Sequence, residues 1–127
     1  MSHRLLGGLS PREFLRRYWQ KRPLFVPRAL PGFAGVLDRR ALGALARRDD
    51  VESRIVERRG TRWDTRHGPF SEAKIRSRNA TLLVNGVNLH LPAAEALLRR
   101  FHFVPQARLD DVMVSYAPPG GGVGPHF

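Results

Sequence analysis

Hydrophobic residues near the start of the chain recur at three- and four-residue spacing, which is typical of amphipathic helices. The segment Ser10-Pro11-Arg12-Glu13 predicts a helix start, because it combines an N-cap residue, a proline at the first helical position and the glutamate of a capping box. We expect its apolar face to pack in the core; that face is Phe14, Leu15, Tyr18 and Trp19.

Two further elements are predicted before residue 50. Leu24-Phe25-Val26 is a short apolar run closed by Pro27, and it is interpreted as a strand. A second helix is predicted to begin at Asp38 and to bury Leu42, Leu45 and Ala46.

From Val51 the pattern changes to the alternation that is typical of strands. Residues 53–58 and 61–65 predict a hairpin around Arg59-Gly60, and residues 81–87 predict a buried strand. A helix over 92–100 with Ala94, Leu97 and Leu98 inward precedes a final strand over 111–116. Helices come first and strands later, so the predicted class is α+β with a mainly antiparallel sheet. We expect one domain, with a helical lead-in over about 9–50 and a β-rich part over about 51–127.

The final strand runs into a loop rich in proline and glycine. Pro118-Pro119 cannot donate ladder hydrogen bonds, and four of the next five residues are glycine. Pro125 and His126 follow. A histidine delivered by such a loop suits a metal site or a general base.

Composition adds a strong positive charge. The 127 residues carry 22 Lys and Arg against 11 Asp and Glu, which gives +11. This excess favours polyanionic surroundings such as RNA or a ribonucleoprotein. The absence of cysteine excludes disulfides and thiolate metal sites, and no apolar run reaches transmembrane length. A soluble cytoplasmic protein that does not engage a membrane is therefore expected.

Six motifs occur in an order that closely resembles the N-terminal half of the bacterial JmjC-type, cupin-fold ribosomal oxygenases, over about residues 9–127. They are Trp19-Gln20-Lys21-Arg22-Pro23-Leu24, the strand containing Ser53-Arg54, His67-Gly68-Pro69-Phe70, Val84-Asn85-Gly86-Val87-Asn88, Asp110-Asp111-Val112-Met113-Val114-Ser115, and Pro119-Gly120-Gly121-Gly122-Val123-Gly124-Pro125-His126.

The resemblance implies the first strands of a double-stranded β-helix that binds Fe(II) and 2-oxoglutarate and uses O2 to hydroxylate a protein side chain. The implied substrate is an arginine of a large-subunit ribosomal protein, the implied partner is the ribosome or its RNA, and family members dimerise through a region absent here. Only His126 matches an iron ligand of the family, and no catalytic or cofactor-binding side chain is assigned. The other ligands of the facial triad would lie beyond Phe127, so we expect this chain alone to be inactive and marginally folded.

Other interpretations stay open. His67 either lines a substrate path or is a structural turn residue, and His102 is interpreted as a satisfied histidine near the core. Asp110-Asp111 either attracts a substrate arginine or caps the strand entry. A non-enzymatic basic module that binds RNA or ribosomes is the main alternative function, and a cupin of another reaction type is a third. The arginines of that basic module would be Arg39, Arg40, Arg47, Arg48, Arg58, Arg59 and Arg62.

Overall fold

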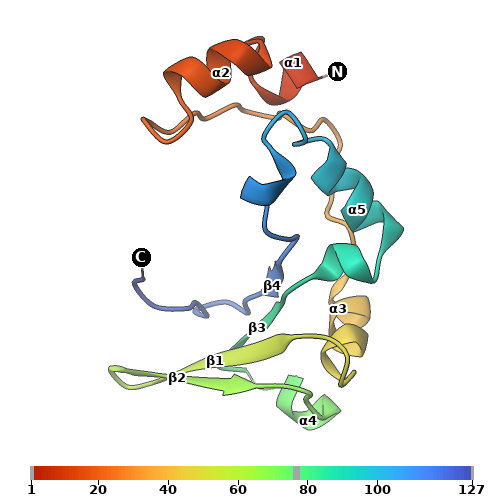
Figure 1. Cartoon of the computed structure of the whole chain (residues 1–127). Helices are drawn as coiled ribbons and strands as arrows, with labels where there is room; N and C mark the ends of the chain where they lie inside the picture. Colours follow the sequence, from red (N-terminus) through yellow and green to blue (C-terminus); the bar gives the residue numbers. More distant parts are fainter. Residues whose placement is uncertain (1, 76–77, 127) are drawn as a thin grey trace. The chain divides into compact units, whose positions relative to one another are not determined.

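The computed structural model describes residues 2–75 and 78–126, and these form two compact units (Figure 1). One unit combines the described residues up to Gly35 with Leu97–Asp110. The other combines Val36–Ala96 with the described residues from Asp111 onward. None of the described helices has both the length and the apolar character needed to cross a bilayer.

The first unit contains α1 (Ser2–Leu5), α2 (Pro11–Arg17) and the 3-10 turn η2 (Gln106–Arg108). The predicted capping box at the start of α2 is confirmed. The Ser10 hydroxyl accepts a hydrogen bond from the Glu13 N–H at 3.2 Å, and the Glu13 carboxylate accepts one from the Ser10 N–H at 2.8 Å. Two orphan donors of the first turn are thereby satisfied.

The aromatic face predicted for this helix forms a half-buried cluster. Phe14 stacks on Tyr18 at 6.4 Å between ring centroids and meets Phe103 edge-on at 5.7 Å. No residue of α2 is fully buried, so the prediction of core packing holds only in part. Trp19 lies beyond the helix, which ends at Arg17.

The predicted strand at Leu24-Phe25-Val26 is wrong. This segment forms no strand, and Phe25 is 86% exposed. A short apolar run becomes a strand only when another strand offers ladder hydrogen bonds, and no described strand does so here.

The second unit is built on an antiparallel sheet of order β2-β1-β3-β4. Its strands are β1 (Ser53–Arg59), β2 (Arg62–His67), β3 (Ala80–Val84) and β4 (Val114–Tyr116). The predicted hairpin is confirmed, since Arg58 pairs with Trp63 and Arg59 with Arg62 on either side of its turn. The α+β class is confirmed as well.

One face of this sheet holds the hydrophobic core. Helix α3 (Arg39–Ala46) begins after the predicted N-cap Asp38, whose carboxylate accepts from the Ala41 N–H at 2.8 Å. The unit is completed by α4 (Glu72–Ile75), η1 (Val87–Leu89) and α5 (Pro92–Arg99), whose last residues lie in the first unit. The core contains Leu42, Leu45, Ala46, Ile55, Leu82, Val84, Val87 and Ala94.

The opposite face of the sheet lies outside that core, although part of it is buried. Antiparallel register places Val56 beside Thr81 and Arg54 beside Leu83, on the face that also carries Trp63. Val56, Thr81 and Leu83 are 7%, 2% and 6% exposed. We call this surface the second face of the sheet.

Candidate metal-ligand loop

The loop after β4 begins where its prolines predict. Strand β4 ends at Tyr116, and the Gly121 N–H closes a turn on the Pro118 carbonyl at 2.8 Å. Gly120 and Gly124 take φ values of +80° and +78°, which residues with a side chain rarely adopt. Gly120 and Gly124 therefore allow backbone conformations that the loop needs and that other residues rarely adopt.

The loop is attached to the second face of the sheet at Thr81. The Gly122 N–H donates to the Thr81 Oγ1 at 3.0 Å, and Thr81 is nearly fully buried. A Cβ on Gly121 would lie 2.9 Å from the Pro118 carbonyl oxygen and 3.1 Å from the same Thr81 Oγ1. Only glycine fits between the turn and the strand.

The loop also rests on the indole of Trp63. A Cβ built on Gly124 would stand 3.0–3.1 Å from three atoms of that ring, and one on Gly122 would stand 3.6 Å from Cη2. The guanidinium of Arg58 lies 5.8 Å from the centroid of the same ring. Trp63 thus supports the loop through direct contact with its backbone.

His126 lies at the end of this path. Its Nδ1 is 2.9 Å from the Gly124 carbonyl oxygen, and the side chain is exposed. A carbonyl can only accept, so this contact requires the hydrogen on Nδ1 in the neutral ring. The Nε2 lone pair then remains available as a metal ligand or a proton acceptor.

His126 is one donor, and the described residues add no complete metal site. Across residues 2–75 and 78–126, no group of three His, Asp or Glu side chains could hold a metal ion. His67 ends β2 and is exposed; His102 is exposed too, in contrast to the expected place near the core. The imidazole nitrogen of His126 is a suitable iron ligand, but the described residues do not form a complete facial triad.

Asp111 has a structural role at the entry to the final strand. Its carboxylate accepts a hydrogen bond from the Gly86 N–H at the start of η1, where Gly86 takes a φ of +61°. In return, the Asn88 Oδ1 accepts from the Val112 N–H at 2.9 Å. These contacts support the capping interpretation of Asp111 over attraction of a substrate arginine.

Arg54 is one of the charged residues on the second face, together with Arg58. It is half-buried, its Nε has no hydrogen-bond partner among the described residues, and its Nη2 lies 3.8 Å from the Met113 sulfur. A half-buried guanidinium suits an anionic group such as a carboxylate. The sequence assigns Arg54 to a resemblance motif but does not bring it together with Thr81 and Trp63, because their common location depends on strand register.

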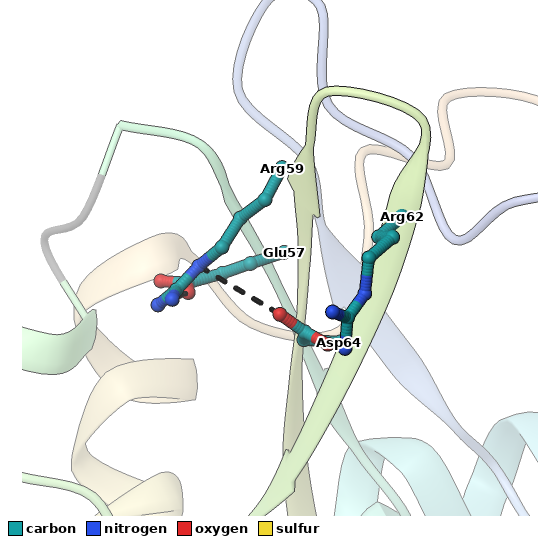
Figure 2. Close-up of polar contacts among 4 residues, drawn as sticks. All are labelled: Glu57, Arg59, Arg62 and Asp64. Atoms are coloured by element: carbon teal, nitrogen blue, oxygen red, sulfur yellow. Dashed lines mark hydrogen bonds and ion pairs between the residues drawn. The ribbon is translucent and has the colours of Figure 1, made fainter.

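The arginines assigned to a basic module are largely engaged within the chain. Arg47 pairs with Glu72 at 2.6 Å and Arg48 with Asp50 at 2.5 Å. At the hairpin, Arg59 contacts Glu57 at 3.1 Å and Asp64 at 3.8 Å, and Arg62 contacts Asp64 at 3.7 Å (Figure 2). Arg39 lies over the Tyr116 ring at 4.6 Å. A phosphate would therefore compete with a carboxylate at four of these seven arginines, although the net charge of +11 already counts those carboxylates.

Comparisons with known proteins agree with the motif resemblance. No family model matches the chain. It is 43% identical over 117 residues to the ribosomal protein uL16 3-hydroxylase of Escherichia coli, covering 91% of this chain and 31% of that protein. It is 36% identical over 122 residues to a probable ribosomal oxygenase of Haemophilus influenzae, covering 94% of this chain and 30% of that protein.

A solved structure gives the same result in three dimensions. The ribosomal oxygenase YcfD from Escherichia coli, in complex with cobalt and 2-oxoglutarate, matches with a TM-score of 0.83 and 39% identity. The match covers 93% of this chain and 33% of that one. The resemblance to ribosomal oxygenases is therefore confirmed, and the chain spans about a third of the length of the relatives it matches.

Proposed function

We propose that this chain, a relative of ribosomal oxygenases over about a third of their length, provides the first iron ligand of an Fe(II)- and 2-oxoglutarate-dependent hydroxylase. The observation that carries the proposal is the way His126 is presented. Its Nδ1 is engaged by the Gly124 carbonyl, so Nε2 faces away from that contact with a free lone pair. Imidazole is a preferred ligand for iron in the facial triad of such oxygenases.

Within this proposal the chain's own residues perform distinct tasks. His126 supplies one neutral nitrogen donor, and the Gly124 carbonyl fixes its tautomer. Arg54, half-buried on the second face, is suited to hold a carboxylate through its guanidinium. When bound, Fe(II) together with 2-oxoglutarate supplies the activation of O2 that hydroxylation of an unactivated C–H bond needs.

The substrate class follows from the relatives. The Escherichia coli relative is a ribosomal protein uL16 3-hydroxylase, and the motif resemblance implies that an arginine side chain is hydroxylated. We extend this substrate, a ribosomal protein met in the cytoplasm, to the present chain. Association with the ribosome itself, or dimerisation, is a further expectation of the same proposal.

A second candidate is a basic module that binds RNA or ribosomes. Its support is the net charge of +11. The ion pairs of Arg47, Arg48, Arg59 and Arg62 weigh against it, since a phosphate would have to displace a carboxylate at each. The oxygenase proposal is therefore preferred.

A chimera tests the preferred proposal. This chain would replace the matching segment of the Escherichia coli uL16 3-hydroxylase, and hydroxylation would be followed as a 16 Da gain on uL16. We expect activity that His126→Ala abolishes and that His102→Ala, the matched control, leaves intact. A chimera with native-like circular dichroism and no hydroxylation would contradict the proposal, as would activity that survives His126→Ala.

A further inference from the structure

We infer that Trp63 is a positioning residue for His126, acting together with Thr81 to seat the loop on the sheet. The inference rests on the proposed function in one respect only, namely that His126 is a metal ligand. We call the contacts of Trp63 and Thr81 with the loop the seat of His126. The seat itself is a matter of contacts between β2, β3 and the loop, all within the second unit.

The path from the ring to the histidine contains few atoms. The indole touches the backbone at Gly124, the carbonyl of Gly124 lies 2.9 Å from His126 Nδ1, and one residue separates the two positions. Any shift of Gly124 away from the ring therefore moves the acceptor that selects the tautomer of His126. Because Trp63 lies on a paired strand, its ring is held more rigidly than the glycine-rich loop could hold itself.

The loop is attached to the sheet at two separate points, which distinguishes this arrangement from incidental packing. The Thr81 hydroxyl accepts a part-buried hydrogen bond from the Gly122 N–H, and the Trp63 ring lies against Gly124, where it leaves no room for a side chain. The loop is thus held at two points from two strands, on either side of Val123. Trp63 is itself held in register by its pairing with Arg58, whose guanidinium lies near the same ring.

The choice of residues at these points agrees with a positioning role. The Trp63 ring fills the space that a side chain at position 124 would occupy, so the loop takes this path only with glycine there. If Trp63 served general stability alone, its replacement would lower the free energy of unfolding without changing the tautomer of His126. The two roles therefore differ in a measurable quantity.

The test uses the 127-residue chain without metal. Long-range ¹H–¹⁵N NMR spectra of the neutral His126 ring report whether Nδ1 or Nε2 carries the hydrogen, and amide exchange reports the Gly122 N–H. In the unaltered chain we expect hydrogen on Nδ1. In Trp63→Leu we expect the tautomer population of an unconstrained histidine, with Gly122 exchange roughly two- to tenfold faster. Trp63→Phe, which keeps a flat ring, should restore most of the original state, and Trp19→Leu in the other unit is the matched control.

Several outcomes would overturn the inference. One is a folded Trp63→Leu chain whose His126 tautomer and Gly122 exchange are unchanged. If Trp63→Leu does not fold, Gly124→Ala and Thr81→Val decide, because each leaves Trp63 in place; an unchanged tautomer in Gly124→Ala together with unchanged Gly122 exchange in Thr81→Val would refute the seat. No iron enters these measurements, so a seat that fails here and a chimera that fails to hydroxylate are separate results.

Discussion

Gly68 lies directly against Ser53. A Cβ on Gly68 would stand 2.1 Å from the Ser53 Oγ and 3.2 Å from Cε2 of Phe70, and the Gly68 N–H donates to the Ser53 carbonyl at 2.9 Å. This contact ties the end of β2 to the start of β1. It explains why glycine stands between His67 and Pro69.

Gly68→Ala should therefore destabilise the second unit by about 1–3 kcal/mol, the usual cost of overpacking a tight site. Urea unfolding followed by tryptophan fluorescence would measure it. Ser53→Ala removes a buried hydroxyl that has no partner among the described residues, and we expect it to be close to neutral. The double variant should recover part of the loss, because the nearest clashing atom is gone. Strict additivity of the two effects would contradict the contact.

How far the sequence predicts such features depends on the range of the interaction. The starts of α2 and α3 are predicted because Ser10, Glu13 and Asp38 act on backbone groups three residues away. The prediction of a strand at Leu24-Phe25-Val26 was wrong because a strand depends on a partner elsewhere in the chain. The seat of His126 was missed for the same reason, since Trp63 and Gly124 are distant in sequence and only strand register and the loop path bring them together.

The capping box predicts a pH dependence for the first unit. Hydrogen bonds from the Ser10 N–H and then from the Ser10 hydroxyl lower the pKa of Glu13 below its ordinary value of 4.5. A carboxyl with a lowered native pKa stabilises the fold above its unfolded pKa, and this contribution is lost as the pH falls through the native pKa. We expect the helicity of α2 to decline below about pH 4.5 in step with that titration. Glu13→Gln should remove this component of the pH profile, and an identical profile in the variant would contradict the assignment.

Asp111 should matter for stability, and Asp110 should not. Asp111→Ala leaves the Gly86 N–H without its acceptor at a half-buried site, which costs about 1–3 kcal/mol. Asp110 is exposed, so Asp110→Ala should stay within about 0.5 kcal/mol of the unaltered chain. Chemical denaturation of both variants would separate them. Equal and small effects would revive the idea that the pair serves to attract a substrate arginine.

The isolated chain should not turn over 2-oxoglutarate. The described residues bring no group of three metal-binding side chains together, and one imidazole holds Fe(II) weakly. With Fe(II), 2-oxoglutarate and O2, we expect succinate release at the level of buffer, and the same level for His126→Ala. Turnover by the unaltered chain that His126→Ala removes would mean that the remaining ligands come from residues not assigned here.

The hairpin network gives a sharp test between the two candidate functions. Glu57 and Asp64, whose side chains are 14% and 33% exposed, pair with the exposed Arg59 and Arg62, and ion pairs with an exposed partner contribute about 0.2–1 kcal/mol each (Figure 2). Glu57→Gln with Asp64→Asn would release both guanidinium groups at little cost in stability. If the basic surface is incidental, binding to a short RNA duplex should be weak in the unaltered chain and become both tighter and more salt-dependent in this variant. Asp49→Asn with Asp110→Asn, which also raises the net charge by two but away from the hairpin, is the control for net charge. Tight, strongly salt-dependent binding by the unaltered chain would instead favour the basic module.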